Sequence, residues 1–171
     1  YDFLEFVAVE RNTDGLFIYP YLDHYWTEPD RFPFLISVEG EHIGFALIRE
    51  ELDPLTNEIA YDLAEFFVMR KFRRKNVGTQ AAHSLMNKLP GRWLLRVLAN
   101  NKPALRFWQH ALKKFNPSYT MLQPSADYEF RFSNSRGKDY PRRPARLSIS
   151  SPNEYLSSVT IRSSTSILAT A

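Results

Sequence analysis

The chain has 171 residues, of which 44% are hydrophobic and 15% aromatic, and it contains no cysteine. This length and composition suffice for one globular domain with a core, and they exclude an intrinsically disordered chain. The lack of cysteine excludes disulfide bonds and a cysteine nucleophile, and no apolar run reaches the roughly 18 to 20 residues that a membrane-spanning helix needs. Since no signal peptide opens the sequence, we expect a soluble, cytoplasmic protein.

The net charge of +3 is unevenly distributed along the chain. Residues 134–171 hold six basic and two acidic residues, whereas residues 1–133 hold sixteen basic and seventeen acidic ones. The first part is therefore not the broadly basic surface that binds nucleic acid. The second part is rich in Ser, Thr, Arg and Pro, which predicts a tail, disordered or loosely docked, with at most short strands at 146–149 or 159–161.

The first fifty residues predict part of a helix, then a loop or short helix, and then a hairpin. Residues 1–11 mix apolar and acidic positions, which indicates part of a helix. Residues 19–30 combine four large aromatic side chains with three carboxylates and two prolines, which favours a loop or a short helix. Residues 34–39 and 42–49 are rich in Phe, Ile, Leu and Val and flank Gly40-Glu41, so they predict an antiparallel hairpin.

Strands and helices then alternate. A strand over 59–69 leads into a helix over 77–89, which Pro90-Gly91 ends before a buried strand over 93–98. The order strand, helix, strand predicts a right-handed parallel crossover. Asn101 and Pro103 suit the start of a second helix. Residues 119–122 and 128–132 predict a closing hairpin.

A basic turn joins the strand over 59–69 to its helix. Five of the six residues 70–75 are Arg or Lys, and Asn76-Val77-Gly78-Thr79 opens the helix. Unpaired N–H groups and the helix dipole favour an anion at a helix N-terminus, so this turn predicts a phosphate site. The alternative is a solvated charged loop or a patch like a nuclear-localisation signal.

Two motifs resemble those of bacterial-type N-acetyltransferases of the GNAT superfamily. The run from Val68 through Phe72-Arg73 to Asn76-x-Gly78-Thr79 is similar to the family's acetyl-CoA signature, and 101–108 is similar to its Asn-x-x-Ala-x-x-Phe-Tyr helix. The resemblance covers residues 34–132 and implies a GNAT-like domain over 1–133. The implied fold is α/β, with a mixed, splayed central sheet flanked by helices and lacking the usual first strand.

The same resemblance implies that acetyl-CoA lies in the gap between the strand that ends at Met69 and the strand over 93–98. Main-chain groups of Phe67, Val68 and Met69 then bond the pantetheine arm, and the basic turn holds the pyrophosphate. Arg106 is expected either to reach the adenosine phosphate or to be a surface charge. The remaining implied cofactor residues are Arg73, Arg74, Lys75, Asn76, Val77, Gly78, Thr79, Asn101 and Trp108.

The sequence departs from the family's pattern at two of these positions. Asn76 stands where the family has its first glycine, and we expect the turn to be retained because Asn tolerates a left-handed backbone better than most residues. Trp108 replaces the tyrosine that commonly protonates the leaving thiolate. An indole N–H donates a hydrogen bond but is no acid near neutral pH.

The implied activity is transfer of acetyl from acetyl-CoA to a primary amine of a small molecule or peptide by direct attack. The ammonium must first lose a proton, and Glu65, on the splayed strand among apolar residues, is the candidate base. An exposed or arginine-paired Glu65 is the alternative. Asp62 is a weaker candidate, which strand alternation places on the opposite face.

The loop over 19–30 is the candidate acceptor site, because carboxylates beside aromatic rings suit a cationic amine. Packing of these rings under the sheet edge is at least an equal alternative. The acceptor candidates are Tyr21, Asp23, Tyr25 and Trp26.

Two other functions stay open. One is a non-catalytic acetyl-CoA-binding or regulatory module, which Trp108 favours. The other, with less support, is a nucleic-acid-binding module built from residues 70–75 and the tail. The four histidines lack metal-ligand spacing, so no metal site is expected. The sequence also leaves a homodimer open and predicts no membrane partner.

Overall fold

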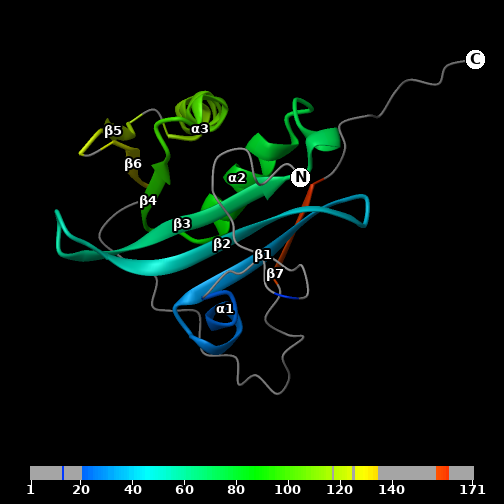
Figure 1. The fold of residues 1–171 in the computed structure, drawn as a ribbon, viewed down its shortest axis with the longest axis horizontal. Coiled ribbons are helices and arrows are strands. Elements are labelled where there is room, and N and C mark those ends of the chain that lie inside the picture. The colour runs from blue at the N-terminus through cyan, green and yellow to red at the C-terminus, as the bar shows by residue number, and fades with distance from the viewer. Residues whose placement is uncertain (1–12, 14–20, 117, 125, 135–156, 162–171) are drawn as a thin grey trace, which may run out of the picture.

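The computed structural model describes residue 13 and residues 21–116, 118–124, 126–134 and 157–161. They form a seven-stranded mixed sheet in the order β5-β6-β4-β3-β2-β1-β7, with helices against both faces (Figure 1). None of the helices in these ranges is long and apolar enough to cross a membrane. The elements are α1 (His24–Thr27), β1 (Arg31–Val38), β2 (Glu41–Asp53), β3 (Glu58–Val68), the 3₁₀ helix η1 (Arg70–Phe72), α2 (Val77–Lys88), β4 (Arg92–Val97), α3 (Lys102–Phe115), β5 (Thr120–Leu122), β6 (Tyr128–Ser133) and β7 (Ser157–Ile161).

Strands β1, β2 and β3 form the antiparallel part of the sheet. The predicted β1–β2 hairpin is confirmed, and it turns at Glu39 and Gly40, whose φ angles are 51° and 84°. Strands β2 and β3 come close together where β3 ends: a Cβ on Gly44 would lie 2.1 Å from the carbonyl oxygen of Phe67. A residue with a side chain at position 44 would therefore force the two backbones apart.

The sheet opens between β3 and β4. These parallel strands pair only at Tyr61↔Trp93 and Asp62↔Leu94. Past that point β3 stays with β2, whereas β4 pairs with β6 up to Val97. The splayed sheet that the family resemblance implies is thus confirmed, and β3, α2 and β4 form the predicted crossover.

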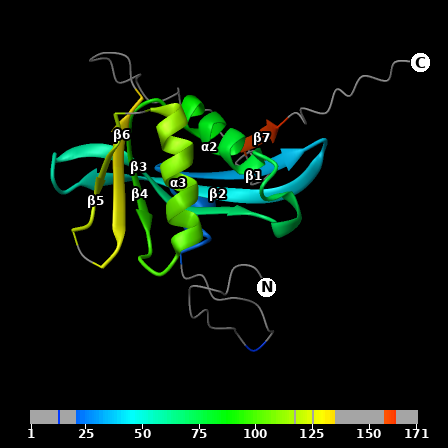
Figure 2. The ribbon, with the colours of Figure 1, turned by 90° about the horizontal axis from the view of Figure 1, so that it is seen from above.

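Helices α2 and α3 lie side by side over one face of the sheet, which we call the helix face (Figure 2). The sequence predicts both, and the inward residues Ala81, Leu85 and Leu112 are at most 1% exposed. They pack into one core with strand residues such as Ile48 and Phe130, both 0% exposed. Burying one large aliphatic or aromatic side chain stabilises a fold by about 1.5 to 3 kcal/mol, so this core holds the helices on the sheet.

The opposite face, which we call the polar face, carries a row of charged side chains and helix α1. Register pairs Arg49 with Asp62 and Arg96 with Glu129, and paired residues point to the same side of a sheet. Helix α1 lies against β1 on this side (Figure 1). The short helix agrees with the expectation of a loop or short helix there.

One extra residue in β3 changes which face its last part presents. Ile48 pairs with Leu63, but the next residue along β2, Leu47, pairs with Glu65, so Ala64 is a β-bulge. The bulge reverses the alternation of side chains, and Asp62 and Glu65 therefore share the polar face. The prediction that they lie on opposite faces is wrong for this reason.

Strand β7 pairs in parallel with β1 and forms an edge of the sheet. It contains the short strand predicted over 159–161. The predicted strand over 146–149 and the predicted helix over 1–11 lie outside the described residues. The domain boundary at residue 134 stays a prediction.

Candidate functional site

The basic turn leads into a helix N-terminus that the chain itself leaves uncapped. Asn76 precedes α2 with φ 61°, and Arg74 has φ 63°, so both adopt the left-handed conformation and the expected turn is retained. In the described part of the chain, Asn76 makes no side-chain cap and the first turn of α2 holds no acidic residue. The N–H groups that begin α2 are thus open to an external acceptor such as a phosphate.

Four of the five cations of this turn divide into two kinds. Lys71 pairs with Glu41 at 2.6 Å, and Arg73 donates from Nε to the carbonyl oxygen of Val68 at 2.7 Å. Arg74 and Lys75 are exposed and form no ion pair with any residue that the structure describes. Two positive charges therefore stand beside the open helix N-terminus, and no carboxylate of the described ranges pairs with them.

The end of β3 borders the gap in the sheet. Val68 is 7% exposed, and the ring of Phe67 stacks on Phe45 with centroids 5.6 Å apart. The amide of Met69 donates to the carbonyl of Ile43 at 2.8 Å. Of the main-chain groups that the family resemblance assigns to pantetheine, the Val68 carbonyl and the Met69 amide thus already have partners inside the chain.

Glycine 78 lets α2 approach α3. A Cβ on Gly78 would lie 3.2 Å from Cε2 of Phe107, which is tighter than an ordinary carbon contact. Its neighbours Val77 and Thr79 are each 8% exposed, so their side chains pack inward while their backbone starts the helix. Gly78 therefore serves the packing of α2 against α3.

Helix α3 places its three predicted site residues differently. The side chain of Asn101 caps the helix by accepting from the amide of Ala104 at 3.0 Å, which confirms the predicted helix start. Arg106 is exposed. Trp108 is 5% exposed and packs edge-on against Phe66 at 5.1 Å, so it belongs to the core.

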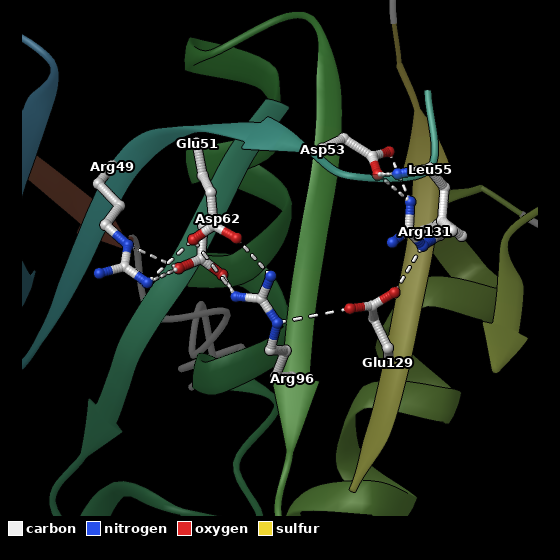
Figure 3. A network of polar contacts seen from close by, with 8 residues as sticks. All are labelled: Arg49, Glu51, Asp53, Leu55, Asp62, Arg96, Glu129 and Arg131. Atoms are coloured by element: carbon white, nitrogen blue, oxygen red, sulfur yellow. Dashed lines mark hydrogen bonds and ion pairs between the residues drawn. The ribbon is translucent and has the colours of Figure 1, made fainter. Parts of the chain in front are cut away.

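A network of ion pairs crosses the polar face where β3 and β4 separate (Figure 3). Asp62 has both oxygens bonded: Oδ2 accepts from Nε of Arg49 at 2.8 Å, and Oδ1 accepts from Nη1 of Arg96 at 3.0 Å. Arg96 also pairs with Glu51 at 2.5 Å and with Glu129 at 3.4 Å. One guanidinium thus links strands β2, β3, β4 and β6.

The network continues toward the β2–β3 turn. Glu129 accepts from Nε of Arg131 at 2.6 Å, and Nη1 of Arg131 lies 2.5 Å from both oxygens of Asp53. Sequence reasoning missed this cluster. A signal was present, because charged residues alternate along three of the strands: Arg49, Glu51 and Asp53; Arg92 and Arg96; Glu129 and Arg131.

Burial and hydrogen bonding shift the carboxyl pKa values in opposite directions. The Asp62 side chain is 3% exposed, and its burial raises its pKa even though Arg96 and Arg49 oppose that change. Burial acts in the same sense on Glu51 and Asp53, but hydrogen bonds from Arg96 and Arg131 outweigh it and lower their pKa values. Ion pairing therefore keeps the outer carboxylates of the network charged.

The four acceptor candidates do not come together. Tyr25 is 1% exposed, burial raises its pKa, and Arg31 lies 5.2 Å from its ring centroid. Arg49 and Asp62 act on it electrostatically, so it borders the polar face. Tyr21 is 61% exposed. Asp23 is exposed as well, and Trp26 is half-buried. The structure thus joins only Tyr25 to the charged row.

Glu65, the candidate base, is half-buried on the polar face, opposite Leu47. No group of three or more metal-ligating side chains occurs among the described residues. Instead, His83 lies 2.9 Å from the carbonyl of Ala111, and His42 bonds Ser37 at 2.8 Å.

Comparison with known proteins places this geometry in a family. The model of the acetyltransferase (GNAT) family matches residues 3–112. No curated protein matches the chain significantly.

Three solved structures are similar to the chain at low identity. NAA60 of Arabidopsis thaliana with a bisubstrate analogue is 15% identical, with TM-score 0.44, over 57% of this chain and 70% of that one. A protein described as a GNAT-family acetyltransferase from Bacteroides thetaiotaomicron is 16% identical, with TM-score 0.48, over 69% and 75%. One from Desulfovibrio desulfuricans is 14% identical, with TM-score 0.38, over 57% and 64%.

The family match covers more than half of the residues, and within it lie the gap between β3 and β4 and the basic turn before α2. The chain therefore belongs to the acetyltransferase (GNAT) family.

Proposed function

We propose that the chain is an acetyl-CoA-dependent N-acetyltransferase that moves the acetyl group to a primary amine by direct attack, without a covalent enzyme intermediate. The observation that carries this proposal is the opening of the sheet past Asp62↔Leu94, on the strand that leads into the uncapped, cation-flanked start of α2. The gap suits an extended pantetheine arm, and the helix start suits the phosphates. Together they fit acetyl-CoA, which is an elongated, anionic thioester.

The start of α2 binds the pyrophosphate in this proposal. Arg74 and Lys75 supply positive charge, and the open N–H groups of Val77, Gly78 and Thr79 supply donors. Exposed Arg106 on α3 is available to the outer phosphate. Asn101, through its cap, and Trp108, through its packing on Phe66, act by fixing the position of α3.

Bound acetyl-CoA supplies an activated acyl group, and the chain must supply a base for the acceptor. The ammonium form of an alkyl amine has a pKa of about 10.4, so it must lose a proton before attack. Glu65 is the candidate for that role because it is half-buried on β3 past Asp62↔Leu94, where the sheet opens. Asp62 lies before that point, and both of its oxygens accept hydrogen bonds from guanidinium groups. The bulge at Ala64 brings Glu65 to the polar face, on the side opposite the cofactor helices.

A non-catalytic acetyl-CoA-binding module is the second candidate. Trp108 favours it, since a buried indole has no proton to give to a leaving thiolate near neutral pH. Nucleic-acid binding has less support, because Lys71 and Arg73 of the basic turn are engaged within the chain. Cytoplasmic localisation and a homodimer stay predictions.

A thiol-release assay tests the proposal. Acetyl-CoA is incubated with the full chain and a panel of primary amines, with the N-acetylated form of each amine as its matched control. We expect at least one amine, and none of the acetylated controls, to accelerate release of free CoA. Binding of acetyl-CoA without release for any amine would instead support the non-catalytic module.

A further inference from the structure

An open pocket lies on the polar face, at the end of β3 and β4 where the two strands pair. Its empty volume is about 550 Å³, part of it open to solvent. Its lining includes Arg92 of β4 and Arg131 of β6, and Asp53 at the end of β2 with Thr56 in the turn that follows. Ser118 and Thr120, just before and at the start of β5, also line it. Arg131 and Leu94 are register partners, so the pocket adjoins the row that contains Asp62.

The carboxylate of this pocket is already saturated. Asp53 accepts from Nη1 of Arg131 at 2.5 Å, from the amide of Leu55 at 2.9 Å and from the side chain of Thr56. It has little capacity left to accept from a ligand. A cationic ligand would therefore find no available partner in Asp53.

Arg131 is engaged with Asp53 and Glu129, but other donors of the pocket are not saturated. Arg92 pairs only with Glu58 in the described chain, through Nη2 at 2.5 Å, and the two side chains are 40% and 45% exposed. An ion pair so exposed contributes little to stability, and another anion can easily replace Glu58 as the partner of Arg92. The side chains of Ser118 and Thr120 have no partner among the described residues. The exchangeable guanidinium of Arg92 and the two hydroxyl groups are donors that can turn to an oxyanion.

We propose that this pocket binds an oxyanion, a carboxylate or a phosphate, that the acceptor amine carries at its far end. The proposal rests on the proposed function. The pocket lies on the same face as Glu65, whereas the start of α2 serves the cofactor's own phosphates. The oxyanion end of the acceptor rests in the pocket while its amine lies at the gap.

The strand geometry sets the length of such an acceptor. Arg92 lies at the pocket and Arg96 lies past the point where β3 and β4 part, four residues along β4. At about 3.3 Å per residue this is about 13 Å. An extended peptide of about four residues has that span between its amino and carboxyl groups.

The first test measures the pocket alone. The full chain is saturated with CoA to occupy the start of α2, and inorganic phosphate or glutarate is titrated while the amide resonances of Ser118 and Thr120 are followed. We expect a saturable shift whose Kd rises at least fivefold in Arg92→Gln. It should stay the same in Lys88→Gln, which removes an exposed charge that does not line the pocket. No saturable shift, or an equal Kd in Arg92→Gln, overturns the proposal.

The second test connects the pocket to the acceptor. Glycine oligomers of two to five residues are compared as free acids and as C-terminal amides, and aminoalkyl phosphates of matching length are compared with the parent alcohols. The acid or phosphate of about four-residue span should exceed its uncharged partner about tenfold in kcat/KM, and Arg92→Gln should remove that preference. Acetylation without such a preference overturns this inference alone. Failure to bind CoA overturns the proposed function, and the phosphate titration, followed at Ser118 and Thr120, can still be interpreted.

Discussion

At the scale of single residues, the extra residue Ala64 decides which carboxylates meet on the polar face. It brings Glu65 to the face of the sheet that carries Asp62. Asp62 lies between Arg49 and Arg96, and each of its two oxygens accepts a hydrogen bond from one of them. In the proposed reaction, proton transfer is assigned to Glu65 because it is half-buried on β3 where the sheet opens.

Replacing Glu65 by Gln should lower kcat by about 100-fold or more, since a general base contributes about 10²- to 10⁴-fold. Binding of acetyl-CoA should stay unchanged, because the residue lies on the face away from α2. The shorter carboxylate of Glu65→Asp is the control and should retain part of the activity. Turnover by Glu65→Gln equal to that of the unsubstituted chain would reject the assignment.

Asp53 gives a prediction about pH. Burial disfavours its charge, but hydrogen bonds from Arg131, Leu55 and Thr56 outweigh burial and hold its pKa below the ordinary value of 3.8. A carboxyl whose folded-state pKa is lowered stabilises the fold fully above its unfolded pKa and loses that contribution as the pH falls through the folded value.

Urea denaturation of the chain and of Asp53→Asn checks this at pH 7 and at pH 2 to 3. The substitution should lower the free energy of unfolding by about 1 to 3 kcal/mol at pH 7, because it removes hydrogen bonds to a charged group that is 6% exposed. The difference should shrink at the lower pH. A difference that does not change with pH would contradict the assigned role of the charge.

At the scale of elements, sequence periodicity predicted most of the fold. Helices α2 and α3 and strands β1 to β6 appear close to their expected positions because apolar spacing, the Asn101 cap and Pro90-Gly91 are local signals. The bulge at Ala64 leaves no such signal, since it arises from pairing with β2. The ion-pair network depends on which strands become neighbours, and that is decided only by the tertiary fold.

The candidate site likewise has features that the sequence predicts and features that only the tertiary fold decides. The left-handed turn at Asn76 follows from residue type, and the structure retains it. That Arg73 turns back to the Val68 carbonyl, while Arg74 and Lys75 stay open, depends on packing and has no local signature. The resemblance could name these residues as a group but could not separate their roles.

The turn before α2 gives the prediction at this scale. Asn76 has φ 61°, a conformation that costs most residues with a side chain about 1 to 2 kcal/mol and glycine nothing. Asn76→Ala should therefore lower stability by about 1 kcal/mol and weaken acetyl-CoA binding, because the helix start is displaced. The matched variant Asn76→Gly should keep both properties. Thermal unfolding and calorimetric titration measure the pair, and identical behaviour of the two variants would refute a constrained turn.

At the scale of the whole molecule, the two faces of the sheet carry different functional groups. The helix face presents the open helix start and its exposed cations. The polar face presents the row of paired charged side chains (Figure 3), Tyr25 and the pocket at Arg92. Between these faces, the backbones of β3 and β4 part past Asp62↔Leu94. An acyl donor entering from one face and an acceptor from the other would meet there.

The central claim is that acetyl-CoA binds with its phosphates at the start of α2. Thermal unfolding with and without acetyl-CoA measures this most directly, in the chain, in Arg74→Gln/Lys75→Gln and in Lys113→Gln/Lys114→Gln. The last variant removes two exposed charges from the far end of α3 as a matched control. A ligand at 100 times its Kd stabilises by about 2.7 kcal/mol, which raises the Tm of a domain of this size by roughly 5 to 10 °C.

We predict that shift for the chain and for the α3 control, and a smaller shift for the Arg74/Lys75 variant at the same ligand concentration. No shift at millimolar acetyl-CoA, or an equal shift in all three proteins, would contradict the account.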